Sequence, residues 1–294
     1  MVISTITSGL GNQLFQYAFA RRKAIEKNSL LYFDLRFYQS AYSKKSSRSF
    51  KLDKFNIQYK HISKPIEYLI KFSKLLPQQS LRPILATVKE HFYHYDSTAA
   101  EEKALIVNLR GYWHSEKYFI KVQNIIRTEL TFNVPHNSTF EDFKKRINAS
   151  PNSVSIHIRR GDYVHHPEFS KTFGFIGIEY YKRAIQFILM KYRDSDFYVF
   201  TDDPEWVNNN FLNYINFTLV VNTGHDADIN DLHLMSLCSH NIIANSSFSW
   251  WGGWLNNNPN KLVIAPESWF KNQPTWDTKD LLPESWIRLK SFES

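Results

Sequence analysis

The chain has 294 residues, of which 43% are hydrophobic and 22% charged, without low-complexity tracts or an obvious internal repeat. This length and composition exclude disordered, fibrous and repeat proteins and predict two globular domains of about 150 residues each. Lys and Arg exceed Asp and Glu by 36 to 28, and the resulting formal charge of +8 suits a phosphorylated substrate, a nucleic acid or an anionic membrane without choosing among them.

The first half begins with alternating strand and helix. Residues 2–7 predict a buried strand, residues 8–11 a tight turn, residues 13–24 a helix and residues 30–34 a second strand. Apolar residues among lysines at 65–76 predict a basic amphipathic helix, which either covers a core or lies on a membrane surface. Residues 104–109 predict a further strand.

The polar stretch 135–153 contains the predicted domain boundary, after which the alternation resumes. Two such series predict an α/β fold with two doubly wound domains that face each other across a cleft, residues 1–150 and 151–294. The later predicted strands lie at 154–158, 197–201, 219–222, 241–244 and 262–265, and the helices at 179–192, at 231–239 and from 250 onward.

The cellular compartment is predicted from what the chain lacks. The start has no charged region followed by a long apolar stretch, and no segment approaches the roughly 18 uninterrupted apolar residues of a spanning helix. The single cysteine, Cys238, lies in an apolar run and has no partner for an internal disulfide. We therefore expect a cytoplasmic protein.

A glycine turn, Gly9-Leu10-Gly11-Asn12, connects the first strand to the first helix. Glycines there let the backbone approach a ligand, and a helix start favours negative charge, although a purely structural turn fits equally well. A dinucleotide fingerprint is excluded because it requires glycine where this chain has Leu14.

A basic motif, His157-Ile158-Arg159-Arg160-Gly161-Asp162, ends the strand that opens the second half. Ligands of open α/β sheets bind at such strand ends, and an arginine there can grip phosphate oxygens and stabilise a departing diphosphate. The alternative interpretation is a surface ion pair with Asp162 beside a core histidine.

Paired acids, Asp202 and Asp203, end the next strand, directly before Pro204. They could bind a divalent cation, accept hydrogen bonds from a base or ribose, or cap a helix. Further oxygen ligands for a metal are not visible nearby.

A polar turn, Asn245-Ser246-Ser247-Phe248-Ser249, follows another strand and opens an apparent helix. Consecutive hydroxyls and backbone amides at a helix start form a phosphate cradle. Because the chain lacks the motifs of zinc peptidases, serine hydrolases and P-loop enzymes, and has no basic run interleaved with aromatics, we expect neither those activities nor nucleic-acid binding.

Taken together, these motifs closely resemble the bacterial α-1,2-fucosyltransferases of glycosyltransferase family 11. The resemblance spans nearly the whole chain and rests on residues 9–17, 157–163, 200–203, 234–236 and 244–252. It implies a GT-B type fold and inverting transfer of L-fucose from GDP-β-L-fucose to the 2-hydroxyl of a galactose, without a metal or other cofactor.

The resemblance also implies roles for individual residues. Arg159 is expected to grip the diphosphate, Asn12 to reach the reaction site from the first domain, and Asp162 to be the candidate general base. The expected donor-binding residues are Gly9, Gly11, Asn12, His157, Arg159, Arg160, Asp202, Asp203, Asn245, Ser246, Ser247, Phe248 and Ser249.

The acceptor is less constrained than the donor. The family implies a galactose-containing oligosaccharide or a lipid-linked surface glycan, as in O-antigen biosynthesis, and peripheral contact with the inner face of the membrane is a hypothesis. The alternatives are a fucosyltransferase with another acceptor or linkage and a non-catalytic GDP-sugar or carbohydrate-binding protein.

Overall fold

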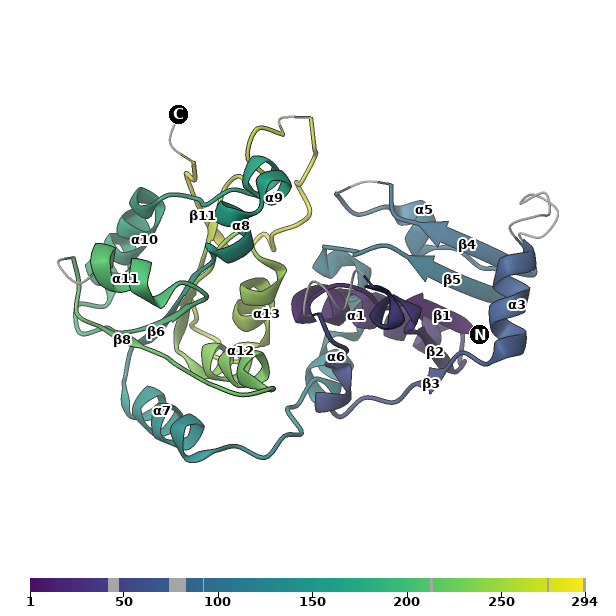
Figure 1. The fold of residues 1–294 in the computed structure, drawn as a ribbon, viewed down its shortest axis with the longest axis horizontal. Coiled ribbons are helices and arrows are strands. Elements are labelled where there is room, and N and C mark those ends of the chain that lie inside the picture. The colour runs from purple at the N-terminus through teal and green to yellow at the C-terminus, as the bar shows by residue number, and fades with distance from the viewer. Residues whose placement is uncertain (42–47, 74–82, 92, 212–213, 274, 293–294) are drawn as a thin grey trace. The chain divides into compact units, whose positions relative to one another are not determined.

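The structure is a computed structural model that describes residues 1–41, 48–73, 83–91, 93–211, 214–273 and 275–292. The chain forms two compact units, Met1–Asn133 with Trp276–Pro283, and Val134–Thr275 with Glu284–Ser294. Each unit is built on a parallel sheet flanked by helices (Figure 1). The first division falls before the predicted boundary at residue 150, because helix α7 (Ser138–Ala149) packs against helix α12 (Ala227–Leu237) of the second unit.

The first unit contains a sheet with the strand order β3-β2-β1-β5-β4. All of its strand pairs are parallel, so the carboxyl ends of β1, β4 and β5 lie at one edge. The strands are β1 (Val2–Thr5), β2 (Leu31–Asp34), β3 (Lys60–His61), β4 (Leu85–Lys89) and β5 (Ile106–Arg110), and the described helices are α1 (Leu10–Glu26), α3 (Lys64–Ser73), α5 (Ser97–Ala100) and α6 (Gln123–Glu129), with short 3-10 turns at Arg36–Gln39, Leu52–Lys54, Glu116–Tyr118 and Ile120–Val122.

Helix α1 begins earlier than predicted. The tight turn after β1 is made at Ser8, which has a φ of 66°, and the helix starts at Leu10 rather than at residue 13. A non-glycine residue in this left-handed region is uncommon and is held by its surroundings. Consequently Gly11 and Asn12 belong to the first helical turn, and Gly9 is the residue before it with extended backbone angles.

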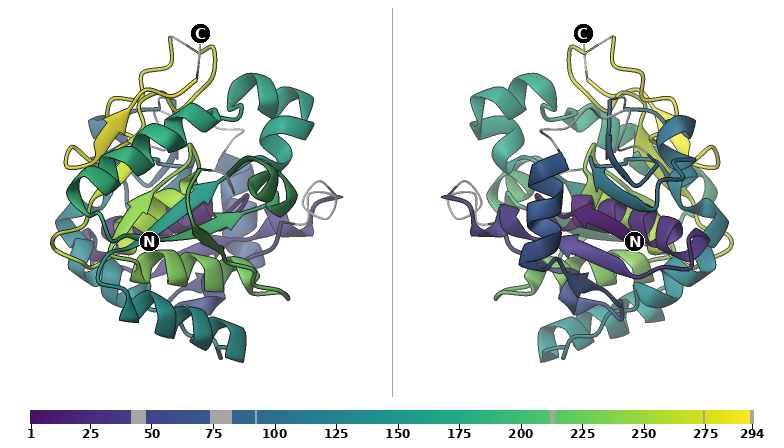
Figure 2. Two further views of the ribbon diagram at one scale, coloured as in Figure 1. Left: turned by 90° about the vertical axis from the view of Figure 1, so that its left-hand side faces the viewer. Right: turned by 90° about the vertical axis from the view of Figure 1, so that its right-hand side faces the viewer.

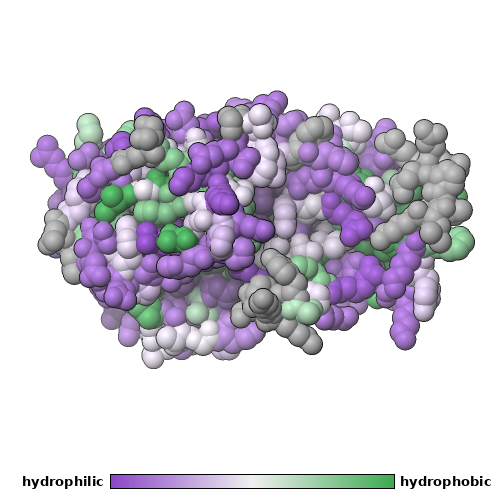
Figure 3. Space-filling model, turned by 45° about the horizontal axis from the view of Figure 1, so that its top comes forward, coloured by the Kyte–Doolittle hydropathy of each residue, from purple (hydrophilic) through white to green (hydrophobic). Residues whose placement is uncertain are grey.

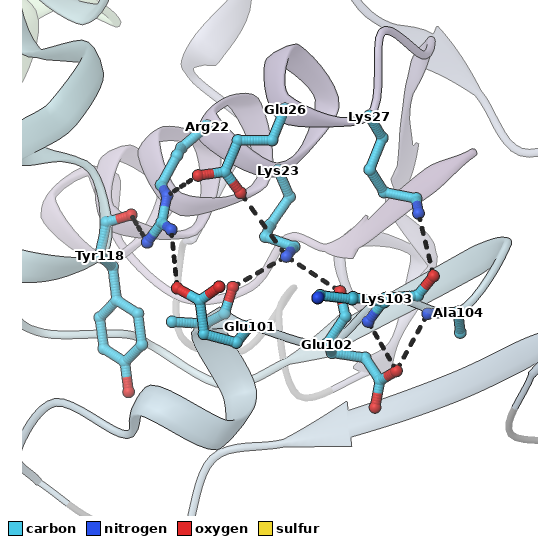
Figure 4. A network of polar contacts seen from close by, with 10 residues as sticks. Arg22, Lys23, Glu26, Lys27, Glu101, Glu102, Lys103, Ala104 and Tyr118 are labelled. Atoms are coloured by element: carbon cyan, nitrogen blue, oxygen red, sulfur yellow. Dashed lines mark hydrogen bonds and ion pairs between the residues drawn. The ribbon is translucent and has the colours of Figure 1, made fainter.

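The second half of α1 is anchored to the segment that leads into β5 (Figure 4). Arg22 is 1% exposed and donates to the Glu26 carboxylate at 2.6 Å and to the Tyr118 carbonyl at 3.3 Å. Lys23 Nζ donates to the Ala100 and Glu102 carbonyls at 2.8 and 3.0 Å. Buried charges that are satisfied in this way fix α1, and with it the position of Asn12, against β5.

The second unit contains a parallel sheet with the strand order β11-β10-β9-β6-β7-β8. Figure 1 shows α10 and α11 on one face of this sheet and α12 and α13 on the other, and Figure 2 gives the two end views. The strands are β6 (Ser153–Ile158), β7 (Asp196–Thr201), β8 (Phe217–Leu219), β9 (His240–Ile242), β10 (Val263–Pro266) and β11 (Ile287–Leu289), and the remaining helices are α8 (Gly161–His165), α9 (Pro167–Thr172), α10 (Ile178–Lys191), α11 (Pro204–Phe211) and α13 (Ser247–Leu255).

The core of the second unit follows from its sequence pattern. Strand β6 is buried along its whole length, as expected for a central parallel strand covered on both faces. Helix α10 turns Tyr180, Tyr181, Ala184, Ile185 and Ile188 inward, the spacing of one helix face. The predicted elements of this half are confirmed with shifts of a few residues, the largest at β8 and α12.

The segment Trp276–Pro283 belongs to the first unit although it follows most of the second along the chain. Asp280 holds it there: its carboxylate accepts from Lys117 Nζ at 2.6 Å and from the Tyr95 amide at 3.1 Å, and its carbonyl accepts from Ser115 Oγ at 2.6 Å. The first unit is therefore completed by late residues of the chain.

Within the described ranges, no helix combines the length and apolar character needed to cross a membrane. Helix α3 covers Lys64–Ser73, and the rest of the predicted amphipathic helix, residues 74–76, lies outside the described residues.

Candidate active site

Three sequence motifs of the second unit meet at one edge of its sheet. Strand β6 lies between β7 and β9, and all three are parallel, so the segments that follow them are neighbours. The end of β6 and the segment after it carry residues 157–162, the segment after β7 carries residues 202–203, and the segment after β9 leads into residues 245–249. The structure thus brings together the donor-binding residues predicted in this unit.

Arg159 is the central cation of this edge. Its Nη2 lies 2.6 Å from Asp162 Oδ1 and its Nη1 lies 2.8 Å from Asp202 Oδ2. Its side chain is 24% exposed and is therefore not fully shielded from solvent. Burial opposes the charge, but Asp202 and Asp162 outweigh it and raise the pKa of Arg159 above its usual value. Arg159 therefore presents a fixed positive charge to solvent.

Arg160 points into a different environment. Its guanidinium lies 4.2 Å from the centre of the Trp206 ring and 4.8 Å from that of Phe175, and its Nε is 3.0 Å from Asp203 Oδ2. Cation–π contacts of this kind hold an arginine in place. The adjacent arginines thus differ, because Arg160 is packed between rings while Arg159 is held by carboxylates at the surface.

The paired acids also divide their roles. Asp202 binds Arg159 and accepts a hydrogen bond from the Arg160 amide at 2.8 Å. A Cβ at Gly161 would lie 2.5 Å from Asp202 Oδ2, so only glycine permits this approach. Asp203 Oδ1 accepts from the Trp206 amide at 3.1 Å and caps α11, which is the capping role that the sequence left open.

His157 is 6% exposed and lies with its ring centre 5.5 Å from that of Phe248 at the start of α13. Burial lowers the pKa of His157 to about 3, so its imidazole is neutral at physiological pH. Its Nδ1 is buried without a hydrogen-bond partner. A buried polar atom without a partner is unfavourable, and the arrangement is typical of a site that is completed by a ligand or water.

Helix α13 begins at this edge. Ser246 is its cap residue, and its Oγ accepts from the Phe248 amide at 3.3 Å. Ser247 and Phe248 are half-buried, whereas Ser249 is 1% exposed and its Oγ is directed to the Ser246 carbonyl. The accessible groups at the helix start are therefore those of Ser247 and Phe248. They lie at the positive end of the helix dipole, which favours the binding of anions.

Asn245 performs a structural task. It is 1% exposed, and its Nδ2 donates to the carbonyls of Phe173, Gly174 and Trp269 at distances of 3.0 to 3.4 Å. These bonds tie the start of the polar turn to two other loops. Asn245 stays a predicted donor-binding residue: its Nδ2 holds the turn in place, and its Oδ1 is buried without a hydrogen-bond partner.

A polar pair formed by Asn222, between β8 and α12, and Asp231, within α12, was not identified as a site from the sequence. Asp231 accepts a hydrogen bond from Asn222 Nδ2 at 2.6 Å, and burial raises the pKa of Asp231 to about 7. Asn222 Oδ1 is buried and has no hydrogen-bond partner. The Asp231 carboxyl group and Asn222 Oδ1 are therefore neighbouring hydrogen-bond acceptors, and Asn222 Oδ1 has no partner in the protein. Such buried acceptors are common in ligand sites.

The first-unit residues predicted for the site lie at the carboxyl edge of its own sheet. Gly9, Gly11 and Asn12 surround the start of α1, and Asn12 Oδ1 lies 2.9 Å from His114 Nε2. His114 follows β5, and nothing in its local sequence distinguished it as a site residue. The signal that could have found it is a strand followed at once by Gly111 and three ring-bearing residues.

Known proteins resemble this chain along nearly its whole length. The profile described as "Glycosyl transferase family 11" matches residues 1–290. An α-1,2-colitosyltransferase of Escherichia coli is 33% identical over 99% of both chains. The O-antigen biosynthesis glycosyltransferase WbnK of Escherichia coli is 31% identical over 97% of this chain and 99% of its own length.

A solved structure supports the fold. A mutant of Arabidopsis thaliana FUT1 in complex with GDP matches 97% of this chain and 75% of its own with a TM-score of 0.54, at 12% sequence identity. At that identity the likeness concerns the fold alone. The predicted fold class, two parallel sheets flanked by helices in a GT-B fold, is confirmed.

Proposed function

Because this chain belongs to glycosyl transferase family 11 and is a glycosyltransferase of the galactoside α-1,2-fucosyltransferase family, we propose that it transfers L-fucose from GDP-β-L-fucose to the 2-hydroxyl of a galactose. The acceptor hydroxyl would attack the sugar from the face opposite GDP, so that the β-linked donor gives an α-linked product.

The observation that carries this proposal is the setting of Arg159. Its guanidinium is fixed by Asp162 and Asp202 and remains partly accessible at the edge where α13 begins. Cleavage of the fucosyl bond places negative charge on the departing diphosphate. A preorganised cation beside a helix start stabilises that charge more than it stabilises the bound donor, which is what accelerates the reaction.

We propose that the reaction needs no metal, with Arg159 supplying the charge that a divalent cation supplies elsewhere. The observed contacts of the paired acids support this interpretation. Asp202 is engaged by Arg159, and Asp203 is engaged by Arg160 and by the first turn of α11. Both carboxylates thus have protein partners for their charge.

Asp231 and Asn222 are proposed to recognise the guanine base. The guanine edge carries two neighbouring N–H donors, and the pair offers a carboxylate and a buried carbonyl oxygen as acceptors. Asn222 follows strand β8, which runs parallel to β7. Asn222 therefore lies at the same carboxyl edge of the sheet as Arg159. A base held there would orient the diphosphate toward Arg159.

The candidate general base stays a prediction. Asp162 Oδ1 accepts a hydrogen bond from Arg159 Nη2 at 2.6 Å, so Asp162 positions the arginine. Among the described residues it is also the carboxylate nearest to Arg159, which makes it the candidate to take the proton of the acceptor hydroxyl. A loose transition state reduces the need for a base, since the attacking hydroxyl becomes acidic only as the bond forms.

The decisive experiment is incubation of the purified protein with GDP-fucose and a panel of β-galactosides in the presence of EDTA. A product fucosylated at the galactose 2-position supports donor, linkage and metal independence together. Hydrolysis of GDP-fucose to free fucose and GDP, without transfer to any galactoside in the panel, would contradict the proposed acceptor and linkage. Other sugars included in the same reactions would then identify a different acceptor.

A second candidate donor is favoured by one observation. The relative that is 33% identical over 99% of both chains is named an α-1,2-colitosyltransferase. Colitose is L-fucose without the 3-hydroxyl group, so the two donors share GDP and differ at one position. Parallel assays with GDP-fucose and GDP-colitose decide between them through the ratio of kcat/KM values.

A membrane-bound acceptor is proposed because a relative is named for O-antigen biosynthesis. Helix α3 exposes Tyr68, Leu69 and Phe72 by 67%, 42% and 61%, next to the exposed Lys64 and Lys71. Most of the face drawn in Figure 3 is hydrophilic, with hydrophobic residues in small patches. An apolar helix face bordered by lysines complements an anionic lipid surface, which we propose that α3 contacts at the inner face of the membrane in the cytoplasm.

A further inference from the structure

The turn that follows β5 presents an aromatic surface at the carboxyl edge of the first sheet. Tyr112 is 41% exposed although one face of its ring is stacked on His114, with ring centres 5.3 Å apart and an interplanar angle of 11°. The Tyr112 hydroxyl lies 3.2 Å from Ser8 Oγ, in the turn after β1. A flat ring at a sheet edge is thus held from two sides.

Hydrogen bonds and close packing restrict the backbone of the turn at residues 111–113. Glu90, directly after β4, accepts hydrogen bonds from the Tyr112 and Trp113 amides at 2.6 and 2.7 Å. Trp113 has a φ of 63° and is fully buried. A Cβ at Gly111 would lie 2.4 Å from the Glu90 Cβ, so glycine is required there. Left-handed backbone at a bulky residue is strained, and such strain gathers at functional sites.

The side chains that the Tyr112 side chain contacts, those of His114 and Ser8, are uncharged. Burial lowers the pKa of His114 to about 4, so its imidazole is neutral near pH 7 and its Nε2 donates to Asn12 Oδ1 at 2.9 Å. Asn12 Nδ2 and His114 Nδ1 then offer a donor and an acceptor, and Ser8 offers a hydroxyl. An aromatic face with neutral donors and acceptors matches a pyranose ring, which has C–H groups on one face and hydroxyls at its rim.

We propose that Tyr112 and His114 form the binding subsite for the acceptor galactoside, with the sugar stacked on the exposed part of the Tyr112 ring and its hydroxyls bonded to His114 and Asn12. Glu90 is a positioning residue that holds the turn. The inference rests on the proposed function, because it identifies where the acceptor of that transfer binds.

The test separates acceptor binding from donor chemistry. In Tyr112→Ala the acceptor KM should rise about tenfold, since the stacking surface is lost, while the donor KM and the slow hydrolysis of GDP-fucose without acceptor stay within about twofold. Tyr112→Phe keeps the ring and should stay close to the unchanged protein in acceptor KM. Thermal unfolding of each variant reports whether the fold is kept.

A matched control is available in the second unit. Tyr192, at the end of α10, is also a tyrosine stacked on a histidine, with ring centres 4.4 Å apart. Its partner, His240, is the first residue of β9, so the pair lies at the amino edge of its sheet. Tyr192→Ala should leave the acceptor KM unchanged. An unchanged acceptor KM in Tyr112→Ala, with transfer intact, overturns the subsite.

Failure of the proposed function has a different signature. If the unchanged protein transfers no sugar from either donor, the function is wrong, and the subsite is then tested by saturation-transfer NMR with methyl β-galactoside. Signals that disappear in Tyr112→Ala and persist in Tyr192→Ala support the subsite without any reference to transfer. Equal signals in both variants refute it.

Discussion

The carboxyl edges of the two sheets differ in chemistry although they share the same parallel architecture. The second edge gathers Arg159 with Asp162 and Asp202, a set of fixed charges. The first edge gathers the neutral side chains of Tyr112, His114 and Asn12, while the carboxylate of Glu90 faces the backbone amides of the turn. One fold therefore supplies an edge suited to a diphosphate and an edge suited to an uncharged sugar, and the difference lies entirely in the residues that follow the strands.

The strongest way to break this comparison is to remove the central charge. Arg159→Ala should reduce kcat by about 1000-fold, the loss typical when a group that stabilises transition-state charge is deleted. The variant also leaves Asp162 and Asp202 without their guanidinium partner, so thermal unfolding must first show that the fold is kept. The exposed Arg193 gives the matched control, and Arg193→Ala should keep full turnover. Near-normal turnover in Arg159→Ala removes Arg159 from the mechanism.

A smaller effect is expected at Asp231. Replacing it should weaken GDP binding but raise the stability of the folded protein. Asp231→Asn should weaken GDP binding about tenfold, measured by calorimetry, since a carboxylate acceptor is lost. The exposed Asp142 on α7 serves as control. Equal GDP affinity in Asp231→Asn and Asp142→Asn would contradict the guanine assignment.

The same variant tests the pKa of Asp231. A raised pKa means that the folded protein keeps the proton while the unfolded chain, with a value near 3.8, releases it. Stability therefore falls as pH rises from about 4 to 7, and the penalty is complete above 7. Asp231→Asn removes the penalty, so it should raise the thermal midpoint at pH 8 more than at pH 5.

Arg160 sharpens the comparison within the charged edge. Arg160→Ala should destabilise the second unit by about 2 kcal/mol, because it leaves Asp203 without its partner and removes the cation between two rings. The loss should appear in urea unfolding. Activity at low temperature should decline far less than in Arg159→Ala, and an equal decline would show that Arg160 also contacts the donor.

The smallest effect is expected at α3, a surface outside both edges. Phe72→Ser should reduce cosedimentation with vesicles containing anionic lipid about threefold, since one apolar side chain is lost from the contact. Phe187 on α10 is 39% exposed and provides the control. Transfer to a soluble galactoside should not change. Cosedimentation that is the same for both variants would argue against α3.

The sequence predicted the charged edge better than the neutral one, and the reason is physical. His157 lies near the end of β6, and Arg159 and Asp202 directly follow β6 and β7, so a local pattern locates them at strand ends. Tyr112 and His114 depend on Glu90, a residue 22 positions away from Tyr112 that acts across the β4–β5 pairing. Strand β4 itself was not predicted, because its short run ends in exposed polar residues.

Asn245 illustrates a second limit. It stands in a motif typical of ligand binding, yet its Nδ2 bonds to carbonyls of residues 72, 71 and 24 positions away. Such partners are set by tertiary packing. Residue type and spacing can place a polar side chain near a site, but they do not reveal which of its polar atoms already have partners in the protein, as Asn245 Nδ2 does and Asn245 Oδ1 does not.

The return of Trp276–Pro283 to the first unit bears on synthesis. Tyr95, Ser115 and Lys117 leave the ribosome long before Asp280, and their bonds to it wait until nearly the whole chain has been made. Trp276 likewise stacks on Tyr93, with ring centres 4.4 Å apart. The half of the protein that is translated first therefore cannot complete its contacts until Trp276–Pro283 has been made, and the second unit in turn waits for Glu284–Ser294.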